Sequence, residues 1–384
     1  MGYEARHWVR LTAACNNYCI FCLDAAARMG EILPMKGIME DLQRGRDAGI
    51  TRVVLSGGEP TIHTHYIEII EKTRAMGYTH IQTVSNGRLF AKQEFLDKCL
   101  AAGLDEITIS VHGHTAELHD KLVGVEGAFK ETIVGLANAL KKPNLIVSCD
   151  VVLNKLNMEV IDDMMWYLVR MGVREFDLLH VIPFSAAWDN WETLNYDPDT
   201  TVEKFHRALT IAQNMGVTIW TNRLRAKYLE GFEHLIQHPM KLHDEVRGRN
   251  KMFTEYITSG KLMHCHGKRC PSCYMESWCG DLINMRKKKQ ITGYTAPKCL
   301  ETGKGRKSKG ETFQWDGPDT DLSKWTQFFI DHRYYVKGSV CKECSYDKVC
   351  AGASVNLIKE KGFKILTAQK RKPPSKRRKA SCPN

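Results

Sequence analysis

The sequence has no apolar run long enough to cross a membrane, and its first residues lack the features of a secretory leader. No uninterrupted apolar run in the 384 residues reaches the length of about 18 that a membrane helix needs. Residues 1–8 carry charges and contain no apolar core, so we expect no secretory signal there. We therefore predict a cytoplasmic protein without a membrane span.

Signals for β-hairpins are also lacking, which argues against an antiparallel all-β fold. Apolar residues make up 43% and charged residues 26% of the chain, a globular composition that excludes a fibrous or wholly disordered protein. Instead, seven short apolar runs, all before residue 221, alternate with amphipathic stretches: 7–11, 52–55, 80–84, 106–111, 145–153, 176–182 and 217–220. Alternation of this kind predicts an α/β fold with a parallel sheet, here a partial (β/α)6 TIM-like barrel.

Positive charge is concentrated in two places. Residues 361–384 contain nine Lys or Arg and no acid, and residues 286–309 contain nine against one Glu. These segments could attract RNA, an acidic peptide or an anionic membrane surface, or could simply keep the protein in solution. We expect three parts: a barrel core over 1–225, a Cys-rich domain over 226–360, and a basic, disordered tail over 361–384.

Fourteen cysteines are too many for ordinary core residues, and most of them cluster. In a cytoplasmic protein, metal ligation explains such clusters better than disulfides do. The first cluster is Cys15, Cys19 and Cys22, directly after the first predicted strand. Three thiolates on one loop suit an iron–sulfur cluster with one open iron, and a zinc site completed by a distant residue is the alternative.

The Cys-x3-Cys-x2-Cys spacing, with Phe21 before the third Cys, resembles the radical S-adenosylmethionine (radical SAM) enzymes. The resemblance covers roughly residues 7–221. It implies a catalytic [4Fe–4S] cluster whose open iron is chelated by S-adenosylmethionine, and a reducing partner such as flavodoxin or ferredoxin. It also implies that residues at the strand ends surround the cofactor: Gly57, Gly58, Glu59, Ser85, Asn86, Ser110 and Asn154. Each of these residues could instead be a satisfied turn or helix cap.

Two runs further along the chain share the spacing Cys-x2-Cys-x5-Cys: Cys270, Cys273 and Cys279, and then Cys341, Cys344 and Cys350. They resemble the SPASM or twitch extensions of the family, which hold auxiliary [4Fe–4S] clusters. On that resemblance we assign Cys299 to the first run and Cys265 to the second as fourth ligands. Structural zinc without a redox role is the alternative.

The resemblance implies reductive cleavage of S-adenosylmethionine to a 5′-deoxyadenosyl radical, which abstracts a substrate hydrogen. We expect the substrate to be a peptide or protein residue. RNA and small molecules or lipids are the alternatives within the family, and a zinc-dependent nucleic-acid-binding protein is the alternative outside it. His112 and His180, near predicted strand ends, are candidate catalytic proton donors, although a satisfied rim histidine is the commoner case.

Overall fold

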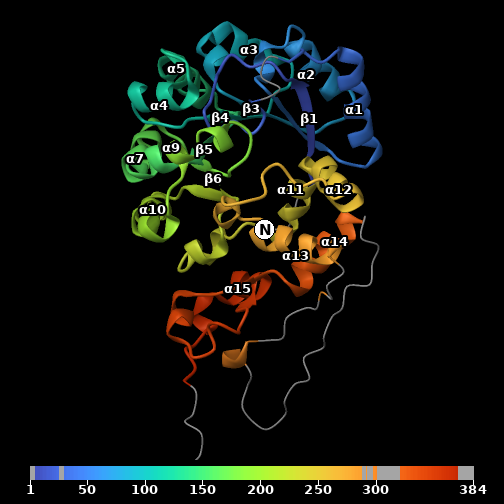
Figure 1. Ribbon diagram of the computed structural model, residues 1–384. Coiled ribbons are helices and arrows are strands. Elements are labelled where there is room, and N and C mark those ends of the chain that lie inside the picture. The colour runs from blue at the N-terminus through green and yellow to red at the C-terminus, as the bar shows by residue number, and fades with distance from the viewer. Residues whose placement is uncertain (1–4, 26–29, 288–290, 292–296, 301–320, 371–384) are drawn as a thin grey trace, which may run out of the picture. The chain divides into compact units, whose positions relative to one another are not determined.

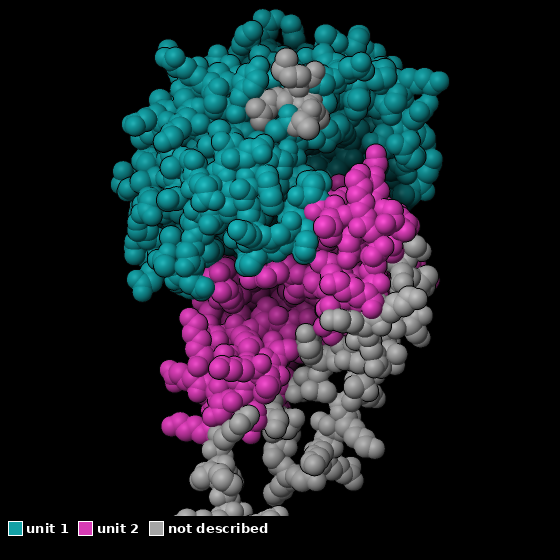
Figure 2. Space-filling model, in the orientation of Figure 1, with its two compact units in different colours: residues 1–224, 264–274 teal, residues 225–263, 275–384 magenta. Residues whose placement is uncertain are grey.

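The computed structural model describes residues 5–25, 30–287, 291, 297–300 and 321–370. Their contacts divide the chain into two compact units, coloured separately in Figure 2. Unit 1 comprises residues 1–224 and 264–274, and unit 2 comprises residues 225–263 and 275–384. The division after Leu224 lies next to the predicted boundary, but the segment 264–274 groups with unit 1. In the described ranges, no helix is both long and apolar enough to cross a bilayer.

Unit 1 is built on a seven-stranded sheet in the order β1 to β7, with every neighbouring pair parallel. The strands are β1 His7–Thr12, β2 Arg52–Gly57, β3 His80–Ser85, β4 Glu106–Ser110, β5 Ile146–Leu153, β6 Glu175–His180 and β7 Thr218–Asn222. Sequential order with parallel pairing is the topology of a partial barrel. The predicted α/β fold class is confirmed, and a seventh strand extends the six-unit description.

Helices connect the strands and lie outside the sheet (Figure 1). They are α1 Met35–Asp47, α2 Tyr66–Ala75, α3 Gln93–Ala101, α4 Ala116–Val123, α5 Ala128–Leu140, α6 Lys155–Met158, α7 Ile161–Met171, α8 Ala186–Asp189, α9 Trp191–Leu194 and α10 Pro198–Asn214. Short 3-10 turns are η2 Pro60–Ile62 and η3 Arg88–Ala91. The core lies between strands and helices, where Val53, Ile81, Ile107 and Leu168 are fully buried.

Alternate residues of β6 show which face meets the helices. Phe176 and Leu178 are buried, whereas Asp177 and Leu179 on the other face are partly exposed. Side chains alternate along a strand, so the second group faces the inside of the partial barrel. A ligand bound at the carboxyl ends of these strands would therefore meet a polar inner face.

Unit 2 contains more regular structure than the sequence suggested. Its helices are α11 Leu242–Gly248, α12 Asn250–Ser259, α13 Glu276–Arg286, α14 Leu322–His332 and α15 Val355–Lys361, and β8 Tyr335–Val336 pairs antiparallel with β9 Ala353–Ser354. Further 3-10 turns are η4 Ala226–Leu229, η5 Glu233–Leu235, η6 Pro239–Lys241, η8 Lys298–Leu300, η9 Ser339–Glu343 and η10 Phe363–Ile365, and η7 Cys270–Ser272 lies in the segment that groups with unit 1. Fully buried Trp278 and Trp325 give unit 2 an apolar core of its own.

The start predicted for the disordered tail, residue 361, is too early in the sequence. Residues 361–370 include the end of α15 and η10, and Phe363 and Leu366 are buried. These two apolar side chains anchor a segment that its many lysines had marked as tail. Residues 371–384 and most of the basic segment 286–309 lie outside the described ranges.

Candidate functional site

The first cysteine cluster occupies the loop that follows β1. Cys15, Cys19 and Cys22 are all half-buried. Within the loop, the backbone N–H of Asn17 donates to Cys15 Sγ and that of Asp24 donates to Cys22 Sγ, both at 3.4 Å. Backbone N–H groups aimed at sulfur stabilise a thiolate more than a thiol, and they are a feature of iron–sulfur ligation. The local backbone is therefore suited to thiolate ligands.

Main-chain hydrogen bonds attach this loop to the end of α4. Tyr18 N–H donates to Val123 O at 2.8 Å, and Ile20 N–H donates to Leu122 O at 3.0 Å. Both donors lie between the first and third cysteines. The loop is thus held by a neighbouring element, and its shape does not depend on a ligand alone.

The Gly57–Gly58 pair brings the end of β2 against the same loop. Gly58 N–H donates to Thr12 O at 2.7 Å, and Glu59 N–H donates to Ala14 O at 2.9 Å. A Cβ atom on Gly58 would overlap the carbonyl oxygen of Ala14, and one on Gly57 would overlap that of Thr12. The resemblance implied that these glycines surround the cofactor. The structure shows that they let it approach the cysteine loop.

Glu59 is almost fully buried and joins three segments through its carboxylate. One oxygen, Oε1, accepts hydrogen bonds from Thr61 N–H at 3.0 Å, Thr61 Oγ1 at 2.6 Å and Ser85 Oγ at 2.8 Å. The other, Oε2, accepts from Asn86 N–H at 2.7 Å. Burial raises the pKa of Glu59, and these four donors oppose that shift. Most of its acceptor capacity is used within the chain, so Glu59 positions the strand ends.

Sequence reasoning missed Arg88, at the start of η3. Its Nη1 donates to Asn16 O at 2.6 Å and Asn17 Oδ1 at 2.9 Å, and its Nε donates to Glu131 at 2.5 Å. Asn86 Nδ2 adds a bond to Asn16 Oδ1 at 2.6 Å. Residues 86–88 therefore brace the cysteine loop from β3. An arginine directly after the Asn-Gly turn was the only signal in the sequence.

A row of polar residues crosses the inner face of the sheet. Ser110 pairs in register with Asp150, and Asp150 pairs with Asp177. Asn222 Nδ2 donates to Asp177 Oδ2 at 3.1 Å. Burial, reinforced by the charge of Asp177, raises the pKa of Asp150 to about 7, although a hydrogen bond from Ser110 opposes the shift. In the described part of the chain, buried Asp150 Oδ1 has no hydrogen-bond partner.

Ser110 and Ser85 lie where the sequence placed them, but Asn154 serves the chain itself. Its Oδ1 accepts from Leu156 N–H at 3.0 Å, its Nδ2 donates to Val152 O at 2.9 Å, and it forms a capping box with Asn157 at the start of α6. This is the helix-cap alternative. Both polar groups of the Asn154 side chain are thus engaged away from a ligand.

The two candidate proton donors have different surroundings. His180 Nδ1 hydrogen-bonds the Tyr196 hydroxyl at 2.7 Å, and the two rings meet edge to face. His112, just after β4, packs its ring against Phe21 of the cysteine loop, with ring centroids 4.5 Å apart. His112 thus contacts the cysteine loop, and burial lowers its pKa well below the usual 6.5.

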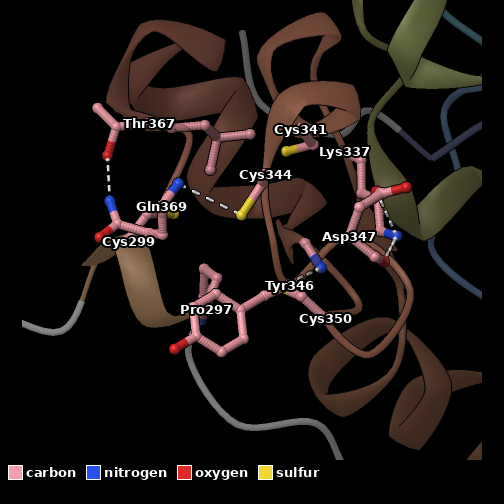
Figure 3. Close-up of a pocket in the computed structure, with 12 residues that line it drawn as sticks. Pro297, Cys299, Lys337, Cys341, Cys344, Tyr346, Asp347, Cys350, Thr367 and Gln369 are labelled. Carbon is pink, nitrogen blue, oxygen red and sulfur yellow. Dashed lines mark hydrogen bonds and ion pairs between the residues drawn. The ribbon is translucent and has the colours of Figure 1, made fainter. Parts of the chain in front are cut away.

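In unit 2, four cysteines line one small pocket: Cys299, Cys341, Cys344 and Cys350 (Figure 3). Gly352 N–H donates to Cys350 Sγ and Gln369 N–H to Cys344 Sγ, both at 3.4 Å. Burial raises the pKa of Cys341, as does the charge that Cys299, Cys350 and Cys344 would carry as thiolates. Four cysteine sulfurs are the number that a fully ligated [4Fe–4S] cluster takes.

This grouping differs from our sequence assignment, which placed Cys299 with the earlier run. Spacing along the chain could not reveal that η8 folds next to η9. The earlier run is divided between the units, with Cys265, Cys270 and Cys273 in unit 1 and Cys279 in unit 2. Cys270 Sγ accepts from Gly267 N–H at 3.3 Å. The ligation predicted for this run stays a prediction.

Among the residues that the structure describes, no three His, Cys, Asp or Glu side chains converge tightly enough to hold a single metal ion. The donors at the β1 loop and in the unit 2 pocket are all sulfur, the ligand type that iron–sulfur clusters take. Both sets fit such a cluster: three ligands on the loop, which leaves one iron open, and four in the pocket.

Comparison with known proteins agrees with this chemistry. Residues 9–168 match the model of the Radical SAM superfamily. The chain is 31% identical over 176 residues to a probable GTP 3′,8-cyclase of Saccharolobus solfataricus, and 28% identical over 185 residues to one of Sulfurisphaera tokodaii. The alignments cover 46% and 48% of this chain, and 56% and 58% of those relatives. The chain thus spans a little over half the length of the curated relatives it matches.

Among solved structures, SuiB of Streptococcus suis bound to its precursor peptide SuiA has a similar fold, with a TM-score of 0.50 and 16% identity. The alignment covers 94% of this chain and 74% of SuiB. The radical SAM superfamily, whose model matches residues 9–168, uses a [4Fe–4S] cluster and S-adenosylmethionine. Residues 9–168 of this chain thus match the radical SAM superfamily.

Proposed function

We propose that the chain reductively cleaves S-adenosylmethionine at a [4Fe–4S] cluster held by Cys15, Cys19 and Cys22, and abstracts a hydrogen atom from its substrate. One observation carries the proposal. A three-thiol loop inside a radical SAM domain is fixed on several sides by hydrogen bonds from the chain itself. When bound, the cluster supplies the electron that cleaves the bond between the sulfonium sulfur and the 5′ carbon of S-adenosylmethionine.

The residues around the loop contribute binding, orientation and exclusion of water. Backbone N–H groups of Asn17 and Asp24 stabilise the sulfur charge. Arg88 and Glu59 keep the loop and the ends of β2 and β3 in fixed relation. The ring of Phe21, within the loop, packs against His112, which follows β4. A radical needs such a rigid, dry site, because small displacements and water both divert it.

A peptide or protein residue is the substrate class that we propose. Its support is the SPASM-like arrangement of cysteines, together with a fold shared with SuiB, which is described bound to a precursor peptide. Within this proposal, the four cysteines of the unit 2 pocket bind an auxiliary cluster. That cluster would accept an electron from a substrate radical or brace unit 2.

A nucleotide is the second candidate substrate, because the curated relatives are described as probable GTP 3′,8-cyclases. The similarity covers only 46% of this chain and 56% of the relative, so the relatives' substrate is no more than a second candidate here. Incubation with GTP separates the two candidates. Turnover of GTP to a new product would overturn the peptide proposal, and 5′-deoxyadenosine formed without change to GTP agrees with it.

Anaerobic cleavage assays test the central reaction. The variant with Cys15, Cys19 and Cys22 all replaced by Ala should form no 5′-deoxyadenosine while it keeps the iron of unit 2. The matched control replaces Cys99 and Cys149, which are fully buried and belong to neither thiol set, by Ala. It should keep both iron and cleavage. Cleavage retained in the triple variant would refute the assignment.

A further inference from the structure

Ser185, in the turn between β6 and α8, has a backbone conformation that residues other than glycine rarely adopt. Its φ is 53° and its ψ is −129°. In the described part of the chain, Arg223 is the only other non-glycine residue with a positive φ. Such a conformation costs on the order of 1–3 kcal/mol and persists only where the surroundings hold it. The serine at this position therefore calls for a functional explanation.

Ring contacts within unit 1 hold the strained turn. The rings of Phe184 and His264 lie with their centroids 4.9 Å apart. The guanidinium carbon of Arg269 lies 4.2 Å from the centroid of the Trp188 ring, and Arg269 Nη1 also donates to Trp188 O. His264 and Arg269 belong to the segment 264–274, which groups with unit 1. The packing of this segment on the turn helps to maintain the unfavourable backbone angles.

The same turn is hydrogen-bonded to the last part of the cysteine loop. Ser185 Oγ accepts a hydrogen bond from Ala25 N–H at 3.1 Å. The next residue, Ala186, donates its backbone N–H to Cys22 O at 3.1 Å. Glycine would adopt the backbone angles of Ser185 without strain, but it has no hydroxyl group to accept from Ala25. The hydroxyl therefore accounts for a serine at a position that favours glycine.

The bond to Ala25 lies next to a bond that reaches a ligand sulfur. Ala25 follows Asp24, whose backbone N–H donates to Cys22 Sγ at 3.4 Å. The Asp24 carboxylate forms an ion pair with Arg10 of β1. This turn of the loop is thus held from β1 on one side and from Ser185 on the other. Hydrogen bonds to the ligand sulfurs are among the factors that set the reduction potential of an iron–sulfur cluster.

We infer that Ser185 is a positioning residue for the catalytic cluster, because its hydroxyl keeps the N–H group of Asp24 directed at Cys22 Sγ. The inference rests on the proposed function, since it takes Cys22 as a ligand of that cluster. A donor to sulfur stabilises the more negative, reduced state. The contact made by Ser185 therefore raises the reduction potential of the cluster and makes the cluster easier to reduce.

Two variants separate the hydroxyl from the strain. Ser185→Gly and Ser185→Ala both remove the hydroxyl, but only glycine also relieves the strain. In both variants the bonds from Ala186 N–H to Cys22 O and from Asn190 Nδ2 to Ile20 O can remain. We expect both variants to have a more negative potential, so that the ratio of reduced to oxidised cluster at a fixed potential falls about threefold, the effect of one weakened hydrogen bond.

The potential is read from the electron paramagnetic resonance signal that S-adenosylmethionine alters, recorded at a series of applied potentials without substrate. Melting temperatures are measured in parallel, and Ser185→Gly should melt at a higher temperature than Ser185→Ala. Thr210→Ala is the matched control, because it removes an exposed hydroxyl that bonds His206 O within α10 at 2.8 Å. It should leave the potential unchanged.

The outcomes distinguish the two hypotheses. If S-adenosylmethionine alters no signal of the wild type, the proposed function fails and the inference fails with it. If the wild type responds and both Ser185 variants keep its potential, the inference about Ser185 fails alone. A shift in Ser185→Ala without one in Ser185→Gly would also overturn it, because the strain would then matter and the hydroxyl would not.

Iron content shows whether a variant keeps the first cluster. Loss of its iron from Ser185→Gly without a lower melting temperature than the wild type would support positioning, since only the cluster site would be affected. Loss of iron together with a lower melting temperature would overturn it, because Ser185 would then serve the general stability of the fold.

Discussion

At the scale of single residues, the carboxyl groups of Glu59 and Asp150 differ in how far hydrogen bonds offset the cost of burying their charge. Glu59 accepts four hydrogen bonds, which offset much of the cost of burying its charge. Asp150 has a bond from Ser110, but its Oδ1 has no partner among the described residues. Both pKa values are raised by burial. Glu59 therefore has a structural role, whereas the carboxyl group of Asp150 can gain or lose a proton near neutral pH.

Asp150→Asn should change how stability depends on pH. The pKa of Asp150 is raised from 3.8 to about 7 in the folded protein. Between these values the folded state holds a proton that the unfolded chain has lost, so stability falls as pH rises through this window. The Asn variant lacks this loss. Its thermal midpoint should exceed that of the wild type by about 2–4 °C near pH 8, and the gain should vanish near pH 4.

Asp97→Asn, on the surface of α3 and paired with Lys142, is the control. It removes a carboxylate without a comparable burial effect. A gain for Asp150→Asn that stayed constant across the pH range would contradict the raised pKa, because a contact effect does not depend on protonation.

Individual roles were harder to predict than positions. Candidate site residues at the ends of β2 to β5 could be picked out from the sequence. The sequence could not show that both polar groups of the Asn154 side chain form hydrogen bonds at the start of α6. It also gave no weight to Arg88, whose partners lie about seventy positions earlier. Hydrogen-bond partners distant in sequence depend on the fold, and no local pattern records them.

At the scale of elements, the loop after β1 and the end of β2 form one structural piece. Their main chains are joined at Thr12 with Gly58 and at Ala14 with Glu59. Only a residue without a side chain fits at Gly58. The geometry of the thiol ligands therefore depends on the adjacent strand as well as on their own loop.

Gly58→Ala should displace the cysteine loop, because its Cβ would overlap Ala14 O. We expect the variant to fold but to retain less iron at the first cluster and to cleave S-adenosylmethionine at least about tenfold more slowly, since small misplacements at a reacting centre have effects of this size. Gly37→Ala, in α1, meets nothing within 4 Å and should be neutral or slightly stabilising. Unchanged cleavage in Gly58→Ala would contradict the steric argument.

The elements of unit 1 were largely predictable, and those of unit 2 were not. Seven apolar runs and the intervening amphipathic stretches correspond to β1–β7 and their helices. They were recognisable because the same strand–helix pattern repeats along the sequence. In unit 2, α13 and α14 are separated by a long basic segment and bury Trp278 and Trp325. Single helices among cysteines and lysines give no repeat to recognise, so the core of unit 2 was missed.

At the scale of the whole molecule, iron content distinguishes the possible sets of ligands. If the unit 2 pocket holds a cluster, Cys299→Ala should lower iron by up to roughly four atoms per chain. Cys99→Ala, a buried cysteine outside both sets, should lower none. Unchanged iron in Cys299→Ala would contradict the binding of a cluster by Cys299 in this pocket.

Unit 2 is assembled from chain on both sides of residues 301–320. Before that stretch come α11 and α13, and after it comes α14. Asp281 of α13 forms an ion pair with Arg333, with Oδ1 2.9 Å from Nη2, and His243 of α11 hydrogen-bonds Gln327 of α14 at 3.2 Å. We expect these contacts to hold the two parts together even without a covalent link between them. A protease site engineered into 301–320 should, once cut, give two polypeptides that migrate as one species under native conditions and separate only in denaturant.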